Sequence, residues 1–275
     1  MRPAAPAASA PLPLEGAAPG AGAAACGTLL LVPNTLDLGA QEIDLREVLP
    51  EGAIRRAAAL AHWAVEDARS ARAFLKRVHA NVPLALPLQG IAVVELPRPR
   101  KGSGEPVAPA QWQALLQPAL AGHDLGLLSE AGLPAVADPG AALVQAAHAA
   151  GLKVLPLAGP SSLMLALAAS GLNGQSFAFV GYLPQDAAAR AARLKELEAL
   201  SRRAGQTQII IETPYRNAAL LAALLATLAA PTRLAVSCGL TLADGWSRTD
   251  TVAGWRARPL EMPERRPAVF SLLAG

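Results

Sequence analysis

Four glutamates stand at the ends of short apolar runs, either directly after the run or one serine beyond it: Glu66, Glu95, Glu130 and Glu212. Apolar runs of this length are typical of buried strands. If the strands are parallel within their sheets, their carboxyl ends lie at one edge and the carboxylates gather there. Such groups can take protons or orient hydroxyl and ammonium groups. Acidic residues also favour helix N-termini through the helix dipole, which would explain Glu66 and Glu212 without a ligand, and both interpretations stay open.

The densest group of chemically capable residues lies within 125–140. A short apolar run predicts a buried strand over 125–128. Asp138 and the proline after it predict a helix start, with the carboxylate as cap, before a helix over 141–150. Gly132, in the loop between, would let the backbone approach a ligand closely. The stretch therefore predicts a ligand-binding loop at the carboxyl end of a strand, although an ordinary capped connection would show the same pattern.

Two arginines follow strand-end glutamates at helical spacing: Arg69 comes after Glu66, and Arg216 comes after Glu212. A guanidinium matches the geometry of phosphate, so both are candidates for holding an anionic substrate. A threonine–proline pair predicts that a helix over 214–228 begins just before Arg216, where a cation opposes the helix dipole. An internal Glu212–Arg216 ion pair that stabilises the turn is the alternative.

Composition and motifs argue against several classes of protein. The chain has 275 residues, 52% of them apolar, which suffices for two domains with buried cores. Aromatic residues make up 4%, which argues against a base-stacking nucleic-acid platform, and a net charge of +3 permits a nucleic-acid partner without indicating one. The glycine motifs of dinucleotide and P-loop enzymes and the His-Glu-x-x-His zinc motif are absent. Cys26 and Cys238 form neither a metal-ligand spacing nor a disulfide framework, so we expect no metal site.

No apolar run approaches the roughly 18 residues of a membrane-spanning helix, so we expect no membrane association and a cytoplasmic protein. Residues 1–25 are nearly all Ala, Pro and Gly and predict a low-complexity tail. Residues 97–104 are basic and rich in Gly and Pro; they predict a solvated loop or, alternatively, a contact to RNA phosphates.

The elements that would position these residues alternate between strand and helix patterns in the first half of the chain. The expected strands there are 28–32, 62–65, 91–94, 125–128 and 152–155, and the expected helices are 54–61, 70–78, 109–121 and 141–150. Such alternation predicts a mostly parallel sheet covered by helices.

A second set of elements follows a predicted domain boundary near Gly159. Its expected strands are 177–180, 207–211, 233–237, 247–252 and 268–273, and its expected helices are 159–171, 187–203 and 214–228. Consecutive strands near the end predict a mixed sheet. The fold class is therefore α/β, with an N-terminal domain over 26–159 and a C-terminal domain over 160–275.

Five segments, in order along the chain, match motifs of one known family: 66–72, 130–140, 156–162, 179–184 and 212–216. Glu130-Ala131-Gly132-Leu133-Pro134 is similar to Asp-Ala-Gly-Thr-Pro, and Glu212-Thr213-Pro214-Tyr215-Arg216 is similar to Glu-Ser-Pro-His-Arg. The chain thus resembles the tetrapyrrole methylase superfamily over roughly residues 27–273. It is most similar to the branch that 2′-O-methylates a cytidine of small-subunit ribosomal RNA.

The resemblance implies two αβα domains, a homodimer, and S-adenosylmethionine bound in a cleft between the domains, lined by 33–38, 129–138, 159–162 and 212–216. The cofactor-binding residues that it implies are Pro33, Glu130, Ala131, Gly132, Pro134, Asp138, Gly159, Pro160, Ser161 and Ser162. Glu66, Arg69, Glu212 and Arg216 are the candidate catalytic residues.

The acceptor stays open between RNA, with ribosomal RNA first, and a small-molecule tetrapyrrole that is methylated on carbon. The loop over 33–39 lacks the internal glycine of the family, which argues against the tetrapyrrole. A third interpretation is a degenerate paralogue that binds the cofactor or RNA without turnover. It is favoured by the altered loop, by a missing histidine segment near Glu95, and by Cys238-Gly239 where the branch has Arg-Glu. Tyr215, where the branch has histidine, argues against identical chemistry.

Overall fold

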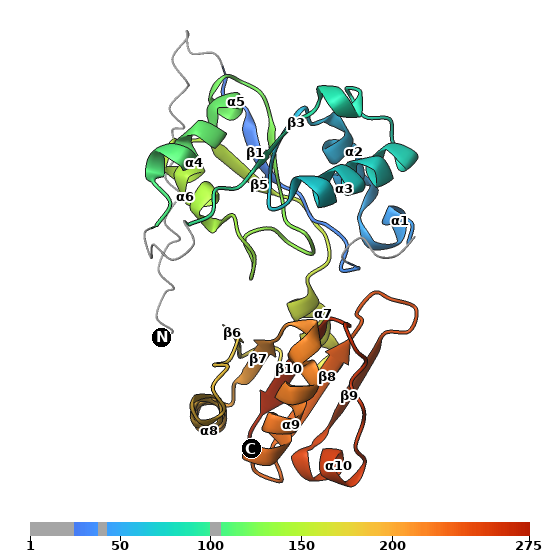
Figure 1. The fold of residues 1–275 in the computed structure, drawn as a ribbon, viewed down its shortest axis with the longest axis vertical. Coiled ribbons are helices and arrows are strands. Elements are labelled where there is room, and N and C mark those ends of the chain that lie inside the picture. The colour runs from blue at the N-terminus through green and yellow to red at the C-terminus, as the bar shows by residue number, and fades with distance from the viewer. Residues whose placement is uncertain (1–24, 38–42, 100–105) are drawn as a thin grey trace, which may run out of the picture.

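The computed structural model describes residues 25–37, 43–99 and 106–275. The expected tail over 1–25 and the basic loop over 97–104 lie mostly outside the described residues. Figure 1 shows two units of strands and helices, one from each half of the chain, joined just ahead of α7 (Ser162–Ser170). The division of the chain at residue 159 stays a prediction, and the two sheets lie on either side of it.

The first sheet consists of five parallel strands in the order β3-β2-β4-β1-β5. They are β1 (Thr28–Leu31), β2 (His62–Val65), β3 (Ala92–Glu95), β4 (Leu125–Leu128) and β5 (Lys153–Pro156). The prediction of a mostly parallel first sheet is confirmed.

Helices cover both faces of this sheet. One face carries α1 (Leu45–Val48), α2 (Glu51–Ala59) and α3 (Ala68–Asn81), with a short 3₁₀ turn η1 (Leu88–Gly90), and the other carries α4 (Pro109–Leu115), α5 (Gln117–Leu120) and α6 (Ala141–Ala149). Neighbouring residues of β1 show the division, because successive strand side chains point to opposite faces. Leu30 is buried in the core beneath α1–α3, whereas Leu29 is buried beneath α4–α6.

β1 and β4 are neighbours in the sheet, but the chain leaves them toward opposite faces. After β1 it forms α1 and α2, and after β4 it forms α6 on the other side. The carboxyl ends of β1 and β4 therefore border a crevice where the connections diverge. Open α/β sheets bind ligands at such a point.

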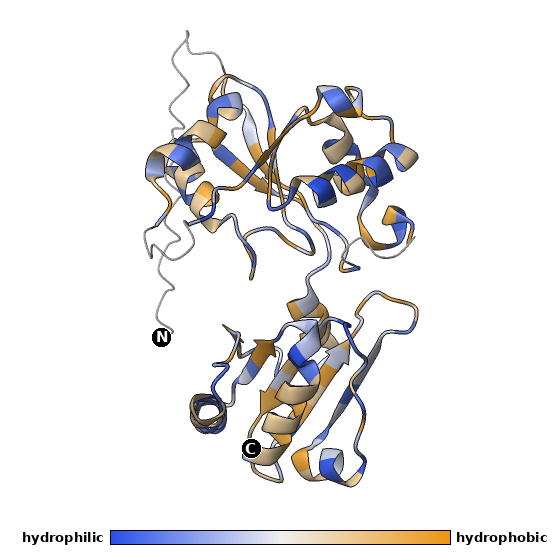
Figure 2. Ribbon diagram, in the orientation of Figure 1, coloured by the Kyte–Doolittle hydropathy of each residue, from blue (hydrophilic) through white to orange (hydrophobic). Residues whose placement is uncertain are grey.

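The second sheet is mixed, as predicted, with the order β6-β7-β10-β8-β9. Its strands are β6 (Phe177–Gly181), β7 (Thr207–Ile211), β8 (Arg233–Cys238), β9 (Trp246–Thr251) and β10 (Ala268–Leu273). Only β6 and β7 run parallel, and β10 pairs antiparallel with both β7 and β8. One face packs on α7, and the other on α8 (Ala187–Ala204), α9 (Asn217–Thr227) and α10 (Val252–Ala257). Figure 2 shows the orange, apolar strands of this sheet between those helices.

Two predicted helix caps are wrong. Asp138 does not cap α6; the chain turns once more, and Gly140 becomes the cap at φ +126°. A β-carbon at Gly140 would lie 2.9 Å from the Leu127 side chain, so the close approach of the loop to β4 decides where the helix begins. Thr213 does not cap with its side chain either, because η2 (Pro214–Arg216), a 3₁₀ turn, precedes α9.

The remaining differences concern helices that are short, interrupted or differently bounded. The helices α2, α3 and α7 begin at residues 51, 68 and 162, where 54, 70 and 159 were expected. The expected helix over 109–121 is divided into α4 and α5. The helices α1 and α10 and the turn η1 were not predicted, because elements of three to six residues carry too little periodic pattern to read. Strand bounds differ from the predicted ones by a residue, which is the ordinary uncertainty at element ends.

Gly126, in the central strand β4, lies against a large buried ring and provides a test of the packing. A β-carbon built there would lie 2.7 Å from Trp63 Cε3, and Trp63 is 1% exposed. We expect Gly126→Ala to lower the free energy of unfolding by about 1–3 kcal/mol, because the ring has no room to move. Urea unfolding would measure the change.

Gly52→Ala, in α2, is the matched control, since nothing lies within 4 Å of a β-carbon there. It should not destabilise the protein. If wild type and Gly126→Ala unfold at the same urea concentration, the packing described for β4 is contradicted.

Candidate active site

Asn34 joins the two loops that diverge at the carboxyl ends of β1 and β4. Its buried side-chain amide donates to the backbone oxygens of Ser129 (3.1 Å) and Glu130 (2.9 Å). Its backbone N–H donates to the oxygen of Gly132 at 2.8 Å, and the Gly132 N–H donates back to Thr35. Because buried backbone groups need partners, these bonds hold the two loops in one arrangement.

Arg77 of α3 fixes the first of these loops from behind. Its guanidinium pairs with the buried Asp37 carboxylate at 3.2 Å and donates to the hydroxyl of Thr35. It also donates to the backbone oxygen of Ile43 at 3.0 Å. One side chain therefore ties down both flanks of residues 38–42, which themselves lie outside the described part.

Glycines allow the loops to approach one another. A β-carbon at Gly159 would lie 2.2 Å from Pro33 Cβ, so only glycine lets the chain leaving β5 pass over the buried Pro33. Gly132 has φ +65°, which disfavours side chains with a β-carbon, and faces Leu36 and the Pro160 oxygen. Two of the implied cofactor-binding residues, Gly132 and Gly159, thus have packing or backbone reasons for their identity.

Two adjoining cavities, of about 140 and 220 Å³, lie between the two units of the protein. Both are lined by Leu36 and Ala131 from the first unit and by Ser162, Tyr182 and Ile211 beyond it. The smaller one adds Gly132, Asp138 and Ser161, and the larger one adds Glu212, Thr213 and Pro214. All four segments expected to line a cleft therefore contribute to it.

Several predicted site residues lie outside these two cavities. Pro33 and Pro134 are buried, and Gly159 and Pro160 border a separate shallow hollow beside α1. Arg69 is exposed on α3, and Glu66 and Glu130 lie at the sheet edge. Of the predicted site residues, the ones that line the two cavities between the units are Ala131, Gly132, Asp138, Ser161, Ser162 and Glu212. The other predicted site residues lie outside these cavities.

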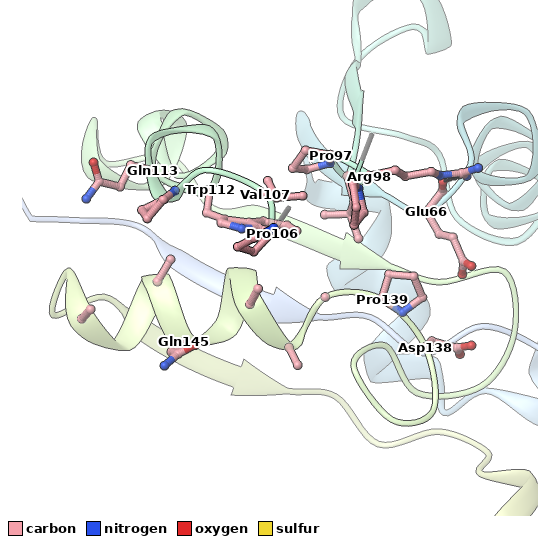
Figure 3. A pocket seen from close by; sticks show the side chains of 18 of the residues that line it. Glu66, Pro97, Arg98, Pro106, Val107, Trp112, Gln113, Asp138, Pro139 and Gln145 are labelled. Carbon is pink, nitrogen blue, oxygen red and sulfur yellow. Dashed lines mark hydrogen bonds between the residues drawn. The ribbon is translucent and has the colours of Figure 1, made fainter. Parts of the chain in front are cut away.

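A larger groove, of about 870 Å³, runs along the α6 side of the same loop (Figure 3). Its walls are mostly apolar and include Pro97, Pro106, Val107, Trp112 and Ala146. Figure 3 shows Glu66, Arg98 and Asp138 at one end of this groove. Among the described residues that line the groove and the smaller cavity between the units, Asp138 is the one common to both. Asp138 therefore borders both spaces.

The carboxylates at this junction are crowded. Burial, together with the negative charges of Glu66 and Glu130, raises the pKa of Asp138 to about 7. Partial desolvation and the charges of Glu66 and Asp67 also raise the pKa of Glu130, against a smaller opposite effect of Arg98. Arg98 relieves little of this crowding, since its guanidinium donates to the backbone oxygen of Glu66 at 3.0 Å. Asp138 can therefore take up or release a proton near neutral pH.

Glu212 and Arg216 form the local ion pair that was one of the two expectations for them. One oxygen of Glu212, Oε1, accepts from Arg216 Nη2 at 2.6 Å and from Arg216 Nε at 3.0 Å. The same oxygen accepts from the backbone and hydroxyl of Thr213. The Glu212 side chain is 5% exposed, so the pair stabilises the turn that presents Thr213 to the cavity. A catalytic role for either residue stays a proposal.

Sequence reasoning missed Asn34, Arg77 and Tyr182 and the groove beside α6. The bonds of Asn34 and Arg77 join residues about forty or more positions apart, so no local pattern marks them. Tyr182 lay within the matched segment over 179–184, and that was the available signal.

No group of His, Cys, Asp and Glu suited to a metal ion occurs in the described residues. Across the same residues, no helix is long and apolar enough to cross a bilayer.

Comparison with known proteins gives a family and a fold. A family model described as Tetrapyrrole (Corrin/Porphyrin) Methylases matches residues 52–253. The ribosomal RNA small subunit methyltransferase I of Vibrio cholerae is 43% identical over 104 residues, which is 38% of this chain and 35% of that protein. The protein of the same name from Xylella fastidiosa is 44% identical over 117 residues, 42% of this chain and 41% of that protein. The matches thus span less than half the length of these relatives.

Two solved structures share the fold. The methyltransferase CobJ superposes with a TM-score of 0.54 at 16% identity, covering 90% of this chain and 100% of that one. A diphthine synthase superposes with a TM-score of 0.57 at 14% identity, covering 90% of each chain. At such identities the likeness concerns the arrangement of the two sheets and their helices.

Arg77→Ala tests the anchoring of the first loop. The change removes the guanidinium beside a buried carboxylate, and we expect the free energy of unfolding to fall by about 3 kcal/mol. Thermal and urea unfolding would measure it. Arg55→Ala is the matched control, because the Arg55–Glu51 pair on α2 is exposed and should contribute about 0.5 kcal/mol or less. Equal effects of the two variants would show that Arg77 does not anchor the loop.

Asp138→Asn tests the crowded junction through its pH dependence. Folding raises the pKa of Asp138, so the folded chain keeps a proton that the unfolded chain loses above its ordinary value. Rising pH therefore costs stability progressively from about pH 4 to about pH 7, and the full penalty remains above that range. The asparagine side chain does not titrate, so the variant does not lose this stability as the pH rises. Its melting temperature should exceed that of wild type by more at pH 8 than at pH 5.

The exposed Glu261 provides the control for this comparison. Glu261→Gln should change the melting temperature equally little at both pH values. A difference between wild type and Asp138→Asn that is the same at pH 5 and pH 8 would show that Asp138 carries no raised pKa.

Proposed function

Because the chain belongs to the tetrapyrrole methylase family, we propose that it is an S-adenosylmethionine-dependent methyltransferase whose acceptor is RNA of the small ribosomal subunit, at a ribose 2′-hydroxyl. The relatives named ribosomal RNA small subunit methyltransferase I support the acceptor. The observation that carries the proposal is the position of Asp138, which lines both the cavity between the units and the groove beside α6.

The cavities between the units fit S-adenosylmethionine in their chemistry. Leu36 and Ile211 offer apolar walls for an adenine ring, and Ser161 and Ser162 offer hydroxyls for polar edges. Asp138 and Glu212 bring carboxylates that complement a cofactor carrying an ammonium and a sulfonium. The cofactor would supply an electrophilic methyl group. The roles of Pro33, Glu130, Pro134, Gly159 and Pro160 in holding the surrounding loops are part of the same proposal.

Asp138 is the residue best placed to move a proton. A ribose hydroxyl must lose its proton as its oxygen gains a methyl group, and a base near its own pKa serves this at neutral pH. Asp138 borders both spaces and has a pKa near 7. Glu66 lies at the same end of the groove and accepts from the Glu130 N–H, so it orients the loop that carries Asp138.

The charges at the groove favour RNA over a tetrapyrrole. A uroporphyrin-type ring carries many carboxylates, and the described residues at the groove end offer it two carboxylates and one arginine. Like charges there would disfavour it. A ribose with its base is neutral, and its phosphates can remain outside. The third interpretation, a paralogue that binds without turnover, is decided by the experiment below.

The homodimer and the cytoplasmic location also belong to this proposal. Met164 and Leu165 of α7 and Phe177 and Phe179 of β6 are exposed apolar side chains on consecutive elements, which suits burial against a second copy. Sedimentation velocity of the purified chain tests the dimer: a monomer at micromolar concentration would overturn it.

A ribosomal acceptor implies the cytoplasm, and recovery of the protein in the membrane fraction of cells would contradict that location.

Methyl transfer tests the function directly. We expect transfer of radiolabelled methyl groups from S-adenosylmethionine to small-subunit ribosomal RNA from a strain that lacks this protein, and none to RNA from a strain that has it. We expect Gly132→Val to abolish cofactor binding measured by calorimetry, because valine disfavours the positive φ and narrows the cavity.

Gly174→Val, at an exposed turn with open space around it, should bind the cofactor as wild type does. Cofactor binding without transfer to any RNA would support the non-catalytic paralogue instead. Unchanged affinity in Gly132→Val would remove the 129–140 loop from the site.

A further inference from the structure

α3 presents a face of exposed cations beside the candidate active site. The helix carries four cationic side chains and no aspartate or glutamate. Arg77 points inward to Asp37, but Arg69, Arg72 and Lys76 are exposed. Their spacing places them along one side of the helix. We call these three residues the α3 stripe.

No carboxylate within the described part of the chain pairs with the α3 stripe. Arg72 donates only to the backbone oxygen of Ala68, and Arg69 and Lys76 have no ion-pair partner there. Arg55 and Arg193, by comparison, pair with Glu51 and Glu196 on their own helices. The positive charge of the stripe is therefore left for a partner outside the chain.

The α3 stripe begins next to the groove. Glu66 lines the groove end, and α3 starts two residues later at Ala68. From Arg69 to Lys76 the stripe extends about 10 Å along the helix axis, at about 1.5 Å per residue. Figure 1 shows α3 running outward from the sheet, and Figure 2 shows its visible side mostly in the blue of hydrophilic residues.

The two surfaces have opposite charge, and this division suits a nucleic-acid strand. Among its described residues the groove end holds two carboxylates, Glu66 and Asp138, against one arginine, Arg98, and so disfavours a phosphate, while its apolar walls and Trp112 suit a neutral ring. The phosphates on either side of a nucleotide in the groove must then lie outside it. The α3 stripe, which begins three residues after Glu66, offers them cations. A base can enter such a groove only when it is unstacked, as in single-stranded RNA.

We infer that the α3 stripe binds the phosphate backbone of single-stranded RNA next to the nucleotide whose ribose is methylated. The inference rests on the proposed function and adds the surface that holds the substrate. Each phosphate contact releases counterions, so binding through the stripe depends on salt in proportion to the number of contacts.

The double variant Arg72→Ala, Lys76→Ala of the full chain tests the inference and leaves Arg69, a candidate catalytic residue, in place. The probe is small-subunit ribosomal RNA from a strain lacking the protein. At 150 mM salt the affinity for RNA should fall roughly tenfold. The slope of the logarithm of the association constant against the logarithm of the salt concentration should become shallower by about 1.4, because each lost phosphate contact contributes about 0.7. Cofactor affinity and melting temperature should not change, since both side chains are exposed. The KM for RNA should rise while kcat at saturating RNA stays the same.

Lys195→Ala, Arg203→Ala on α8 is the matched control, because it removes the same charge from exposed positions on the second unit (Figure 1). It should retain the affinity and salt slope of wild type. Arg72→Lys, Lys76→Arg keeps the charge and should stay within about twofold of wild type. Competition by polyglutamate as strong as by RNA would mark a surface for acidic protein and overturn the inference.

The outcomes separate the inference from the function on which it rests. If wild type methylates the RNA and the double variant matches it in affinity, slope and KM, the α3 stripe does not bind the substrate and the function stands. If wild type binds the cofactor but neither binds nor methylates RNA, the proposed function fails and the inference with it.

Discussion

The side-chain amide of Asn34 is the contact on which the candidate site depends. β1 and β4 end side by side, and the fold sends the chain from them toward opposite faces of the sheet. Past the strand ends no ladder of hydrogen bonds remains to hold the loops together. Asn34 replaces it by donating to Ser129 and Glu130 and by exchanging backbone bonds with the Gly132 region. Leu36 and Asp138 line their cavities because these two loops keep this arrangement.

Charge is separated across the first unit in a way that packing alone does not require. Glu66, Glu130 and Asp138 crowd the carboxyl edge of the sheet, which raises the pKa of Asp138 to about 7 and costs stability. The cations that could relieve the crowding lie instead on the outer face of α3. Strain of this kind is common at functional sites, where a group must change its protonation state. An acidic interior beside a basic exterior suits a substrate with a neutral reacting unit and an anionic chain.

Local sequence patterns determined most of the architecture. The apolar run of β4, the alternation of elements before Gly159 and the consecutive strands near the C-terminus predicted two α/β units with a parallel and a mixed sheet. The motif at Glu212 and Arg216 also offered an ion pair as one of two interpretations, and the pair is present, because residues four apart meet on one turn. Patterns failed where elements are short, as with α1 and α10, since so few residues show no period.

The tertiary structure alone decided how the site works as a unit. Asn34 reaches Ser129 across 95 positions of sequence, and Arg77 reaches Asp37 across 40, so neither contact leaves a local signature. Asp138 illustrates the limit: its sequence context predicts a helix cap, but the chain turns once more, Gly140 takes the cap position, and Asp138 lines both the groove and the smaller cavity. The sequence by itself determined the elements and the types of residue available. Burial and the distances between charges, which set the pKa of Asp138, exist only once the distant segments have packed.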